Sequence, residues 1–320
     1  MNTIFAMNIP RAYSEAIIKM RVWGEEEQSR NGPVITSLDP VLLHVARPME
    51  RVLFDGVRDC NPFFHVMEFV WMIAGENDVR WIEQFNKGFR QYADVRTNNL
   101  HGAYGWRWIK HFGTNQIQAA ADLLAKDATT RRAVIGMWDP RVDLVPHADL
   151  PCNTQIMFRY VSGQLDMTVI NRSNDLVWGM LGANAVHMTY LHELMCHMTG
   201  MKIGFYKVFT NNLHIYKEMP KFDAIWGTCA PVDEYSTVKP YPLLDDTETY
   251  EMLVSDCVNL INEGEQWIPK TDWMRFVARP MYMAYMERLH GGTGKCYIDE
   301  IEATDWRLAC EQYVNRRKAK

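Results

Sequence analysis

One cysteine of the chain has a charged partner in a predicted hairpin. The β-rich runs 154–161 and 165–170 flank a Ser-Gly turn, so residues paired across the hairpin should have numbers that sum to about 325. Cys152 then lies opposite residue 172, 173 or 174, and one of these is Arg172. A guanidinium beside a thiol lowers the pKa of the thiol and makes it a nucleophile. The alternative is that Cys152 is one more small core residue, because free cysteines are usually buried and inert.

A single carboxylate interrupts an apolar run. Residues 63–75 predict a helix that opens after Pro62 and is apolar nearly all round, so it should be buried. Glu68 is the exception, and burying an unpaired charge is costly. Glu68 is therefore exposed, paired with a base such as Arg58, or placed in a cleft with a raised pKa. The helix has no polar stripe to share with Glu68, which favours the cleft.

Arginines at predicted turns and strand ends could bind a phosphate, since guanidinium groups suit bidentate contacts with such an anion. They are Arg30, Arg131, Arg132 and Arg172. Solvated charge is the ordinary alternative for each of them. The segment 211–216 follows a predicted strand, and its alternate polar groups could bind a sugar hydroxyl or only satisfy a turn.

A metal site is a weaker candidate. His192 and Cys196 share a face of the predicted helix 184–199 at i,i+4 spacing, which faintly resembles a zinc motif. The second ligand is a cysteine and no third ligand has a clear spacing, so we expect no metal. A zinc hydrolase would instead carry stoichiometric zinc.

The composition describes the molecule that must hold these groups. The chain has 320 residues, 48% hydrophobic and 23% charged, with a formal net charge of −5. This charge argues against a broad nucleic-acid-binding surface, whereas a small anion needs only a few arginines. Seven scattered cysteines, no signal pattern and no run of about 20 apolar residues predict a cytoplasmic protein with free thiols and no membrane contact.

The elements that position the candidates predict an α+β fold with an antiparallel or mixed sheet flanked by helices. Helices are expected at 13–29, 63–75, 115–125 and 184–199, and strands at 41–46, 133–138, 154–161, 165–170 and 203–210. Helices are also expected at about 245–262, 272–288 and 297–316. We therefore divide the chain into a core over 1–230 and a helical C-terminal extension over 231–320, packed on the core.

The order of the motifs resembles that of the thymidylate synthase family. The central motifs are Leu150-Pro-Cys-Asn153, Asn171-Arg-Ser-Asn-Asp175, Gly179-Met-Leu-Gly-Ala-Asn184 and His214-Ile-Tyr216. Upstream, Glu68-Phe-Val-Trp71 is similar to the family's Glu-Leu-Leu-Trp helix, Gly102-Ala-Tyr-Gly105 to its Tyr-Gly turn, and Arg131-Arg132 to its paired arginines. The match covers roughly residues 30 to 216, and so many motifs in a fixed order would rarely arise by chance.

The resemblance implies a reaction and its catalytic residues. A homodimer with shared active sites would transfer a one-carbon unit from 5,10-methylenetetrahydrofolate to C5 of a pyrimidine deoxynucleoside monophosphate. Cys152 would add to C6 of the base as the nucleophile. Glu68 would handle protons at the base and order water, and Tyr104 would assist removal of the C5 proton. Asn184 would read the edge of the base.

The resemblance also implies the binding residues. The 5′-phosphate would contact Arg30, Arg172 and Ser173, together with Arg131 and Arg132 from the other subunit. The sugar 3′-hydroxyl would contact His214 and Tyr216. Folate would contact Asp175 and Trp71.

The product is a separate question. Members that make dTMP close a dry site with a short apolar C-terminus, whereas this chain ends in Asn315-Arg-Arg-Lys-Ala-Lys320. Those members carry Cys-His and a tryptophan pair where this chain has Cys152-Asn153 and, nearby, Phe89 and Tyr92. Tyr104-Gly-Trp106 is closer to the phage nucleotide hydroxymethylases, in which water captures the C5 methylene. We favour hydroxymethylation, which would supply a modified base for viral DNA in a host cytoplasm, with methylation to dTMP as the alternative.

The base is also open to two interpretations. Asn184 favours dUMP, because an amide offers uracil both a donor and an acceptor, whereas deoxycytidylate hydroxymethylases carry an aspartate. The loop 179–184 is one residue longer than the usual pattern, so dCMP remains an alternative. A non-catalytic scaffold that only binds nucleotide or RNA is a third hypothesis, and it predicts that Cys152→Ser leaves function untouched.

Overall fold

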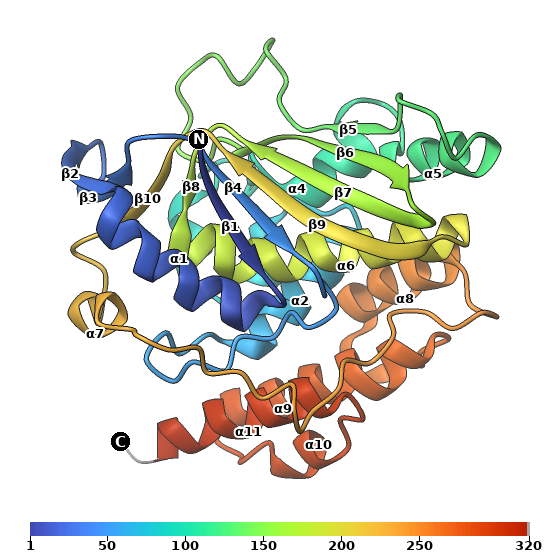
Figure 1. Cartoon of the computed structure of the whole chain (residues 1–320). Coiled ribbons are helices and arrows are strands. Elements are labelled where there is room, and N and C mark those ends of the chain that lie inside the picture. The colour runs from blue at the N-terminus through green and yellow to red at the C-terminus, as the bar shows by residue number, and fades with distance from the viewer. Residues whose placement is uncertain (319–320) are drawn as a thin grey trace.

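Two sheets form the centre of the molecule, which is represented by a computed structural model that describes residues 1–318 (Figure 1). Ala319 and Lys320, the end of the basic C-terminus, lie outside the described residues. The six-stranded sheet has the order β1 (Asn2–Ala6), β4 (Val41–Val45), β9 (Lys202–Thr210), β7 (Gln164–Asn171), β6 (Asn153–Val161) and β5 (Val134–Gly136). The four-stranded sheet has the order β2 (Gly24–Ser29), β3 (Gly32–Ser37), β10 (Leu213–Tyr216) and β8 (Asn174–Asp175).

Both sheets are mixed. The pairs β1/β4, β7/β9 and β8/β10 are parallel, and the other neighbouring strands are antiparallel. With helices on the sheet, this arrangement confirms the predicted α+β class.

The helices pack in layers on one side of the six-stranded sheet. The longer ones are α1 (Ile9–Trp23), α2 (Pro62–Ile73), α5 (Gln116–Lys126), α6 (Asn184–Thr199), α8 (Tyr250–Glu263), α9 (Arg279–Leu289) and α11 (Thr304–Lys318). The short ones are α3 (Val79–Ile82), α4 (Tyr104–Trp106), α7 (Phe222–Trp226) and α10 (Lys295–Asp299). Helix α6 packs on β7 and β9, α2 packs on α6, and α8, α9 and α11 pack on α2. Figure 1 shows the C-terminal helices gathered below the core.

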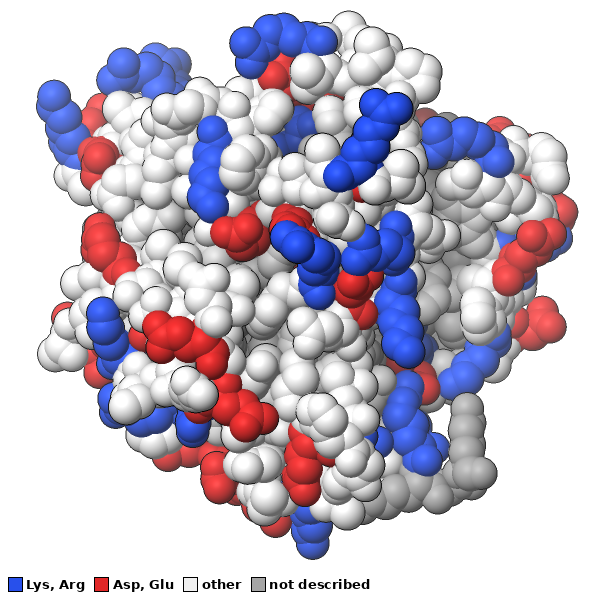
Figure 2. Space-filling model, turned by 180° about the vertical axis from the view of Figure 1, so that it is seen from behind, with Lys and Arg blue, Asp and Glu red and all other residues white. Residues whose placement is uncertain are grey.

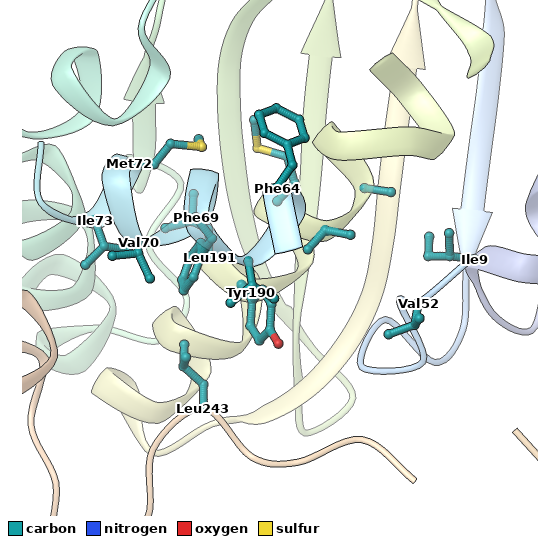
Figure 3. Packing of buried hydrophobic residues seen from close by; sticks show 14 of the residues in the cluster. Ile9, Val52, Phe64, Phe69, Val70, Met72, Ile73, Tyr190, Leu191 and Leu243 are labelled. Atoms are coloured by element: carbon teal, nitrogen blue, oxygen red, sulfur yellow. The ribbon is translucent and has the colours of Figure 1, made fainter. Parts of the chain in front are cut away.

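Helix α2 is the centre of the packing. Its N-cap Asn61 accepts a hydrogen bond from the Phe64 amide, and every residue of the helix except Glu68 is buried. Figure 3 shows α2 side chains against those of α6, where the rings of Phe69 and Tyr190 stack with centroids 4.7 Å apart. Fully burying each large apolar side chain contributes about 1.5–3 kcal/mol. The apolar run therefore forms a buried helix, as its composition predicted.

The C-terminal region forms polar contacts with the core at two places. The Tyr190 hydroxyl of α6 accepts hydrogen bonds from the indole Nε1 of Trp273 (3.3 Å) and of Trp306 (2.7 Å). At the end of α11, Arg316 Nε lies 2.9 Å from Asp59 Oδ1, in the loop that leads into α2. Part of the basic C-terminus thus pairs with an acid of the core.

Three features of the predicted secondary structure are wrong or missing. The helix expected at 13–29 ends at Trp23, and Gly24–Ser29 forms β2 instead. The chain leaves the helix at Gly24, where a Cβ would lie only 2.7 Å from the Met20 carbonyl oxygen. The strand β2 that begins there pairs with β3. The helix expected at 297–316 is divided into α10 and α11. Four strands, β1, β3, β8 and β10, were not predicted.

The surface carries charges of both signs. Figure 2 shows basic and acidic side chains interspersed over one face, without a broad basic area. No helix within residues 1–318 combines the length and the apolar character that crossing a membrane requires.

Candidate active site

A cavity of about 230 Å³ lies between α2, the start of α4 and the loop before β6. Five of the residues singled out in the sequence line it together: Glu68, Trp71, Tyr104, Cys152 and Asn184. They come from four separate parts of the chain. A nucleophile, an acid, a phenol and an amide thus face one small space.

The β6–β7 hairpin places Cys152 next to Arg172. Ile156 pairs with Val169, and a register shift near Asn153 brings the Arg172 amide to 3.0 Å from the Cys152 carbonyl oxygen. This confirms the predicted register. The Arg172 side chain turns toward the same segment, since its Nε donates to the Pro151 carbonyl oxygen at 3.0 Å.

The expected lowering of the Cys152 pKa is wrong in direction. Burial raises the pKa of the thiol and outweighs Arg172, which acts to lower it. A thiolate loses its hydration when it is enclosed, and one partly exposed guanidinium does not restore that loss. The thiol of the free protein is therefore protonated at neutral pH.

Of the three environments considered for Glu68, the structure shows the third, a cleft in which its pKa is raised. Burial, with a smaller contribution from Asp149, raises the pKa of Glu68 to about 8. Its Oε2 is buried and has no hydrogen-bond partner among the described residues. His187 Nε2 lies 3.4 Å away, but burial lowers the pKa of His187 to about 3, so this contact is between neutral groups. Arg58 is engaged elsewhere, donating from Nε to the Val177 carbonyl oxygen.

Tyr104 reaches the cavity because α4 packs directly on the backbone of α2. A Cβ on Gly105 would lie only 1.9 Å from the Met72 carbonyl oxygen, so no larger residue fits there. The Tyr104 hydroxyl accepts a long hydrogen bond, 3.4 Å, from the Asn153 amide. Burial raises the pKa of Tyr104 above its ordinary value.

Asn184 keeps its place in the cavity despite the extra residue before it. Leu176–Ala183 forms η3, a π-helical turn with a kink at Leu181 and Gly182. A π-turn absorbs one additional residue within a helix, often at a functional site. The longer loop therefore widens the turn and leaves Asn184 at the start of α6, facing Cys152 across the cavity.

Trp71 lines the cavity, whereas Asp175 is not among the lining residues. Asp175 caps η3 by accepting a hydrogen bond from the Trp178 amide, and burial raises its pKa to about 6. Its Oδ2 is buried and has no partner within the described structure. The Trp71 ring lines the cavity, and its Nε1 donates to the Asp78 carbonyl oxygen at 3.0 Å.

The residues expected at the sugar share the four-stranded sheet. His214 of β10 pairs with Asp175 of β8, and the rings of His214 and Tyr216 lie 5.1 Å apart. Asn212 links the group, because its Oδ1 lies 3.0 Å from His214 Nδ1 and 3.5 Å from Ser173 Oγ. Ser173 and His214 are therefore held at one edge of this sheet.

The four arginines come from three parts of the chain. Arg30 is exposed in the turn between β2 and β3, and Arg131 and Arg132 are exposed just before β5. Of the arginines in residues 1–318, none lines the cavity, and Arg172 is the one in contact with the Cys152 segment.

Asp149 is a cavity residue that sequence reasoning missed. Its Oδ2 accepts a hydrogen bond from the Gly102 amide at 2.7 Å, and burial raises its pKa. It lies in a loop without periodicity, so only its position three residues before Cys152 could have indicated it.

The candidate zinc ligands His192 and Cys196 are both buried on α6. His192 Nε2 lies 2.6 Å from the Leu165 carbonyl oxygen inside the core. The potential metal group within residues 1–318 is Asp245, Glu248 and Asp272, far along the chain from Cys196.

Comparison with known proteins agrees with the geometry. The family model described as thymidylate synthase matches residues 12–225. A deoxyuridylate hydroxymethyltransferase of Pseudomonas phage M6 is 38% identical over 339 aligned residues, which cover 100% of this chain and 95% of that protein. Proteins of the same name from Bacillus phage SP01 and Delftia phage PhiW-14 are 30% and 34% identical, covering 72% and 68% of this chain and 65% and 62% of their own lengths. The chain belongs to the thymidylate synthase family.

Proposed function

We propose that this enzyme transfers a one-carbon unit to C5 of dUMP and releases 5-hydroxymethyl-dUMP. The observation that carries the proposal is the cavity in which Cys152 faces Glu68, Tyr104 and Asn184. The names of the three phage relatives support both the substrate and the hydroxymethyl product. Because these relatives are phage proteins, the product would serve modified viral DNA in the host cytoplasm.

The nucleotide would be activated by Cys152. Burial holds the thiol protonated, so its proton passes to solvent as the nucleotide binds, and Arg172 stabilises the resulting thiolate. The thiolate adds to C6, which makes C5 nucleophilic. Tyr104 assists removal of the C5 proton. Glu68, neutral at pH 7, can donate a hydrogen bond to the base, and Asn184 pairs with its edge.

The donor of the one-carbon unit would be 5,10-methylenetetrahydrofolate, which supplies a methylene group at the oxidation level of formaldehyde. The residues present fit such a ligand. Asp175 Oδ2 is a buried acceptor with no partner among residues 1–318, suited to an N–H of a pterin ring, and Trp71 with Met72 gives the cavity an apolar wall. Asp175 and Trp71 would hold this ligand beside the nucleotide.

The phosphate and sugar would lie along the edge where β7 ends and β8 meets β10. Arg172, Ser173 and Arg30 would bind the phosphate, and His214 and Tyr216 the 3′-hydroxyl. The side-chain Nδ2 of Asn31, the residue after Arg30, lies 3.5 Å from the Tyr216 hydroxyl, which supports the inclusion of the β2–β3 turn.

A homodimer would complete the phosphate site. One face of the six-stranded sheet is open, with Phe5 71% and Phe205 42% exposed. Such an apolar face suits a second copy of the chain. Arg131 and Arg132, exposed before the edge strand β5, would then reach the phosphate of the neighbouring subunit. Sedimentation tests the dimer, and a monomer at working concentration would refute it.

The C-terminal extension would support the catalytic core. We propose a boundary near residue 230, with 1–230 as the catalytic core and 231–320 as the extension. Its helices α8, α9 and α11 pack on α2, the helix that carries Glu68.

Mass analysis of the nucleotide product tests the function. The protein is incubated with methylenetetrahydrofolate and either dUMP or dCMP, with Cys152→Ser as the control. A gain of CH2O on dUMP and release of tetrahydrofolate are expected. A gain of CH2 would indicate methylation to dTMP, and modification of dCMP alone would assign the other base. No change with either nucleotide would refute the enzyme activity.

A further inference from the structure

Asp149 lines two neighbouring cavities. The cavity with Cys152 adjoins a larger one of about 470 Å³, lined by polar groups that include Asn77, Asn99, His101 and His111. Asp149, Tyr92 and Leu100 line both cavities. Among these shared residues, Asp149 is the one with a carboxylate, so it borders both the polar cavity and the space where the nucleotide would react.

The carboxylate is held firmly in this position. The Gly102 amide donates to Asp149 Oδ2 at 2.7 Å. A Cβ on Gly102 would lie 3.0 Å from Asp149 Oδ1 and 3.1 Å from the Pro151 nitrogen, so a larger residue would have to push these neighbours apart. Beside the larger effect of burial, the negative charge of Asp149 also raises the pKa of Glu68 and of Cys152.

The two carboxylates of the cavity suit opposite tasks. Glu68 has a pKa of about 8, so at neutral pH it is a neutral acid that cannot accept another proton. Asp149 has a pKa raised by burial, but the Gly102 amide, His101, Arg107 and His147 all favour its charged form. A base works best when its pKa approaches the working pH while it stays ionised.

We propose that Asp149 is the base that takes a proton from the water which captures the C5 methylene. This assignment rests on the proposed hydroxymethylation of dUMP. It gives the reaction a residue for the step that distinguishes hydroxymethylation from methylation.

The step balances without an oxidant or reductant. Before it, the nucleotide carries a double-bonded CH2 at C5 and is bonded at C6 to the Cys152 sulfur. The water oxygen bonds to this CH2 carbon, while one water proton passes to Asp149. The electron pair of the double bond moves onto O4, then returns to form the C5–C6 double bond as the C6–S bond breaks. Cys152 leaves as a thiolate, and Asp149 passes its proton to solvent.

The test separates water capture from the steps before it. Asp149→Asn is compared with wild type and with Asp122→Asn, a matched change at an exposed position on α5. The substrate is dUMP tritiated at C5, so tritium release reports loss of the C5 proton and mass analysis reports the hydroxymethyl product. An added small thiol, whose thiolate forms in solution without a base from the protein, traps the CH2 group as a thioether. Equilibrium binding of dUMP provides a readout besides turnover.

For Asp149→Asn we expect unchanged dUMP binding, continued tritium release and a fall in hydroxymethyl product of about 10²–10⁴-fold. The thioether should become the main product when thiol is present. In wild type, the ratio of hydroxymethyl product to released tritium should fall as acid protonates Asp149, and the variant should lack this pH dependence.

Three results would overturn the assignment. They are a wild-type rate of hydroxymethyl product in Asp149→Asn, an equal loss of tritium release and product, and a similar defect in Asp122→Asn. A wild-type enzyme that makes no hydroxymethyl nucleotide would refute the proposed function itself, and the role of Asp149 with it.

Discussion

Replacing Glu68 by glutamine should make the protein more stable and nearly inactive. In the folded chain the pKa of Glu68 is about 8, against 4.5 for an ordinary glutamate. At neutral pH the folded state therefore keeps a proton that the unfolded state loses. Wild-type stability is highest relative to the variant below pH 4.5 and falls as the pH rises toward 8.

The size of the effect follows from the two pKa values. Each pH unit between them corresponds to about 1.4 kcal/mol of free energy of unfolding. Glu68→Gln, which is neutral at all pH, should exceed wild type by about 3 kcal/mol near pH 7 and by about 5 kcal/mol above pH 8. Turnover should fall by about 10²–10⁴-fold, because glutamine cannot exchange a proton.

Urea unfolding of both proteins over this pH range measures the difference. Glu25→Gln, at an exposed position on β2, is the control and should show no such trend. A stability difference between Glu68→Gln and wild type that stays constant with pH, or that shrinks as the pH rises, would refute the neutral buried carboxyl.

Three further changes probe the site. Asn184→Asp should shift the kcat/KM ratio toward dCMP by about 10²-fold or more in a competition assay, and an unchanged ratio would exclude Asn184 as the base reader. Gly105→Ala should cost about 3 kcal/mol or more in chemical unfolding, since the new Cβ meets the Met72 carbonyl oxygen at 1.9 Å; wild-type stability would contradict that packing. Alkylation of Cys152 should accelerate as the pH rises, and Arg172→Ala should slow it by about 3–10-fold; a faster variant would contradict the stabilising effect of Arg172 on the thiolate.

Local patterns predicted the elements that carry the nucleophile. Alternating residues and a Ser-Gly turn were enough to place Cys152 opposite residue 172, 173 or 174, and the structure selects Arg172, because hairpin register follows from turn length. Helix 184–199 was also predicted with its observed ends, since Gly200 adopts a left-handed conformation there.

Features that depend on tertiary structure were not predictable in the same way. Gly24–Ser29 is rich in glutamate and looks helical, but its pairing with β3 makes it a strand. The pKa of Cys152 depends on how much protein covers the thiol, and the hairpin register alone does not contain that information. Asp149 gains its place from the Gly102 amide, a residue distant in sequence.

The covering of α2 by the last helices has a consequence for how the protein is made. Residues 62–73 leave the ribosome early, whereas α8, α9 and α11, which pack on this helix, are synthesised much later. Until then the nascent chain exposes one of its most apolar segments, a state that favours chaperone binding and aggregation. The packing around the segment that holds Glu68 is therefore completed only once these helices have been made, so slow or truncated synthesis should lower the yield of active enzyme more than the length lost would suggest.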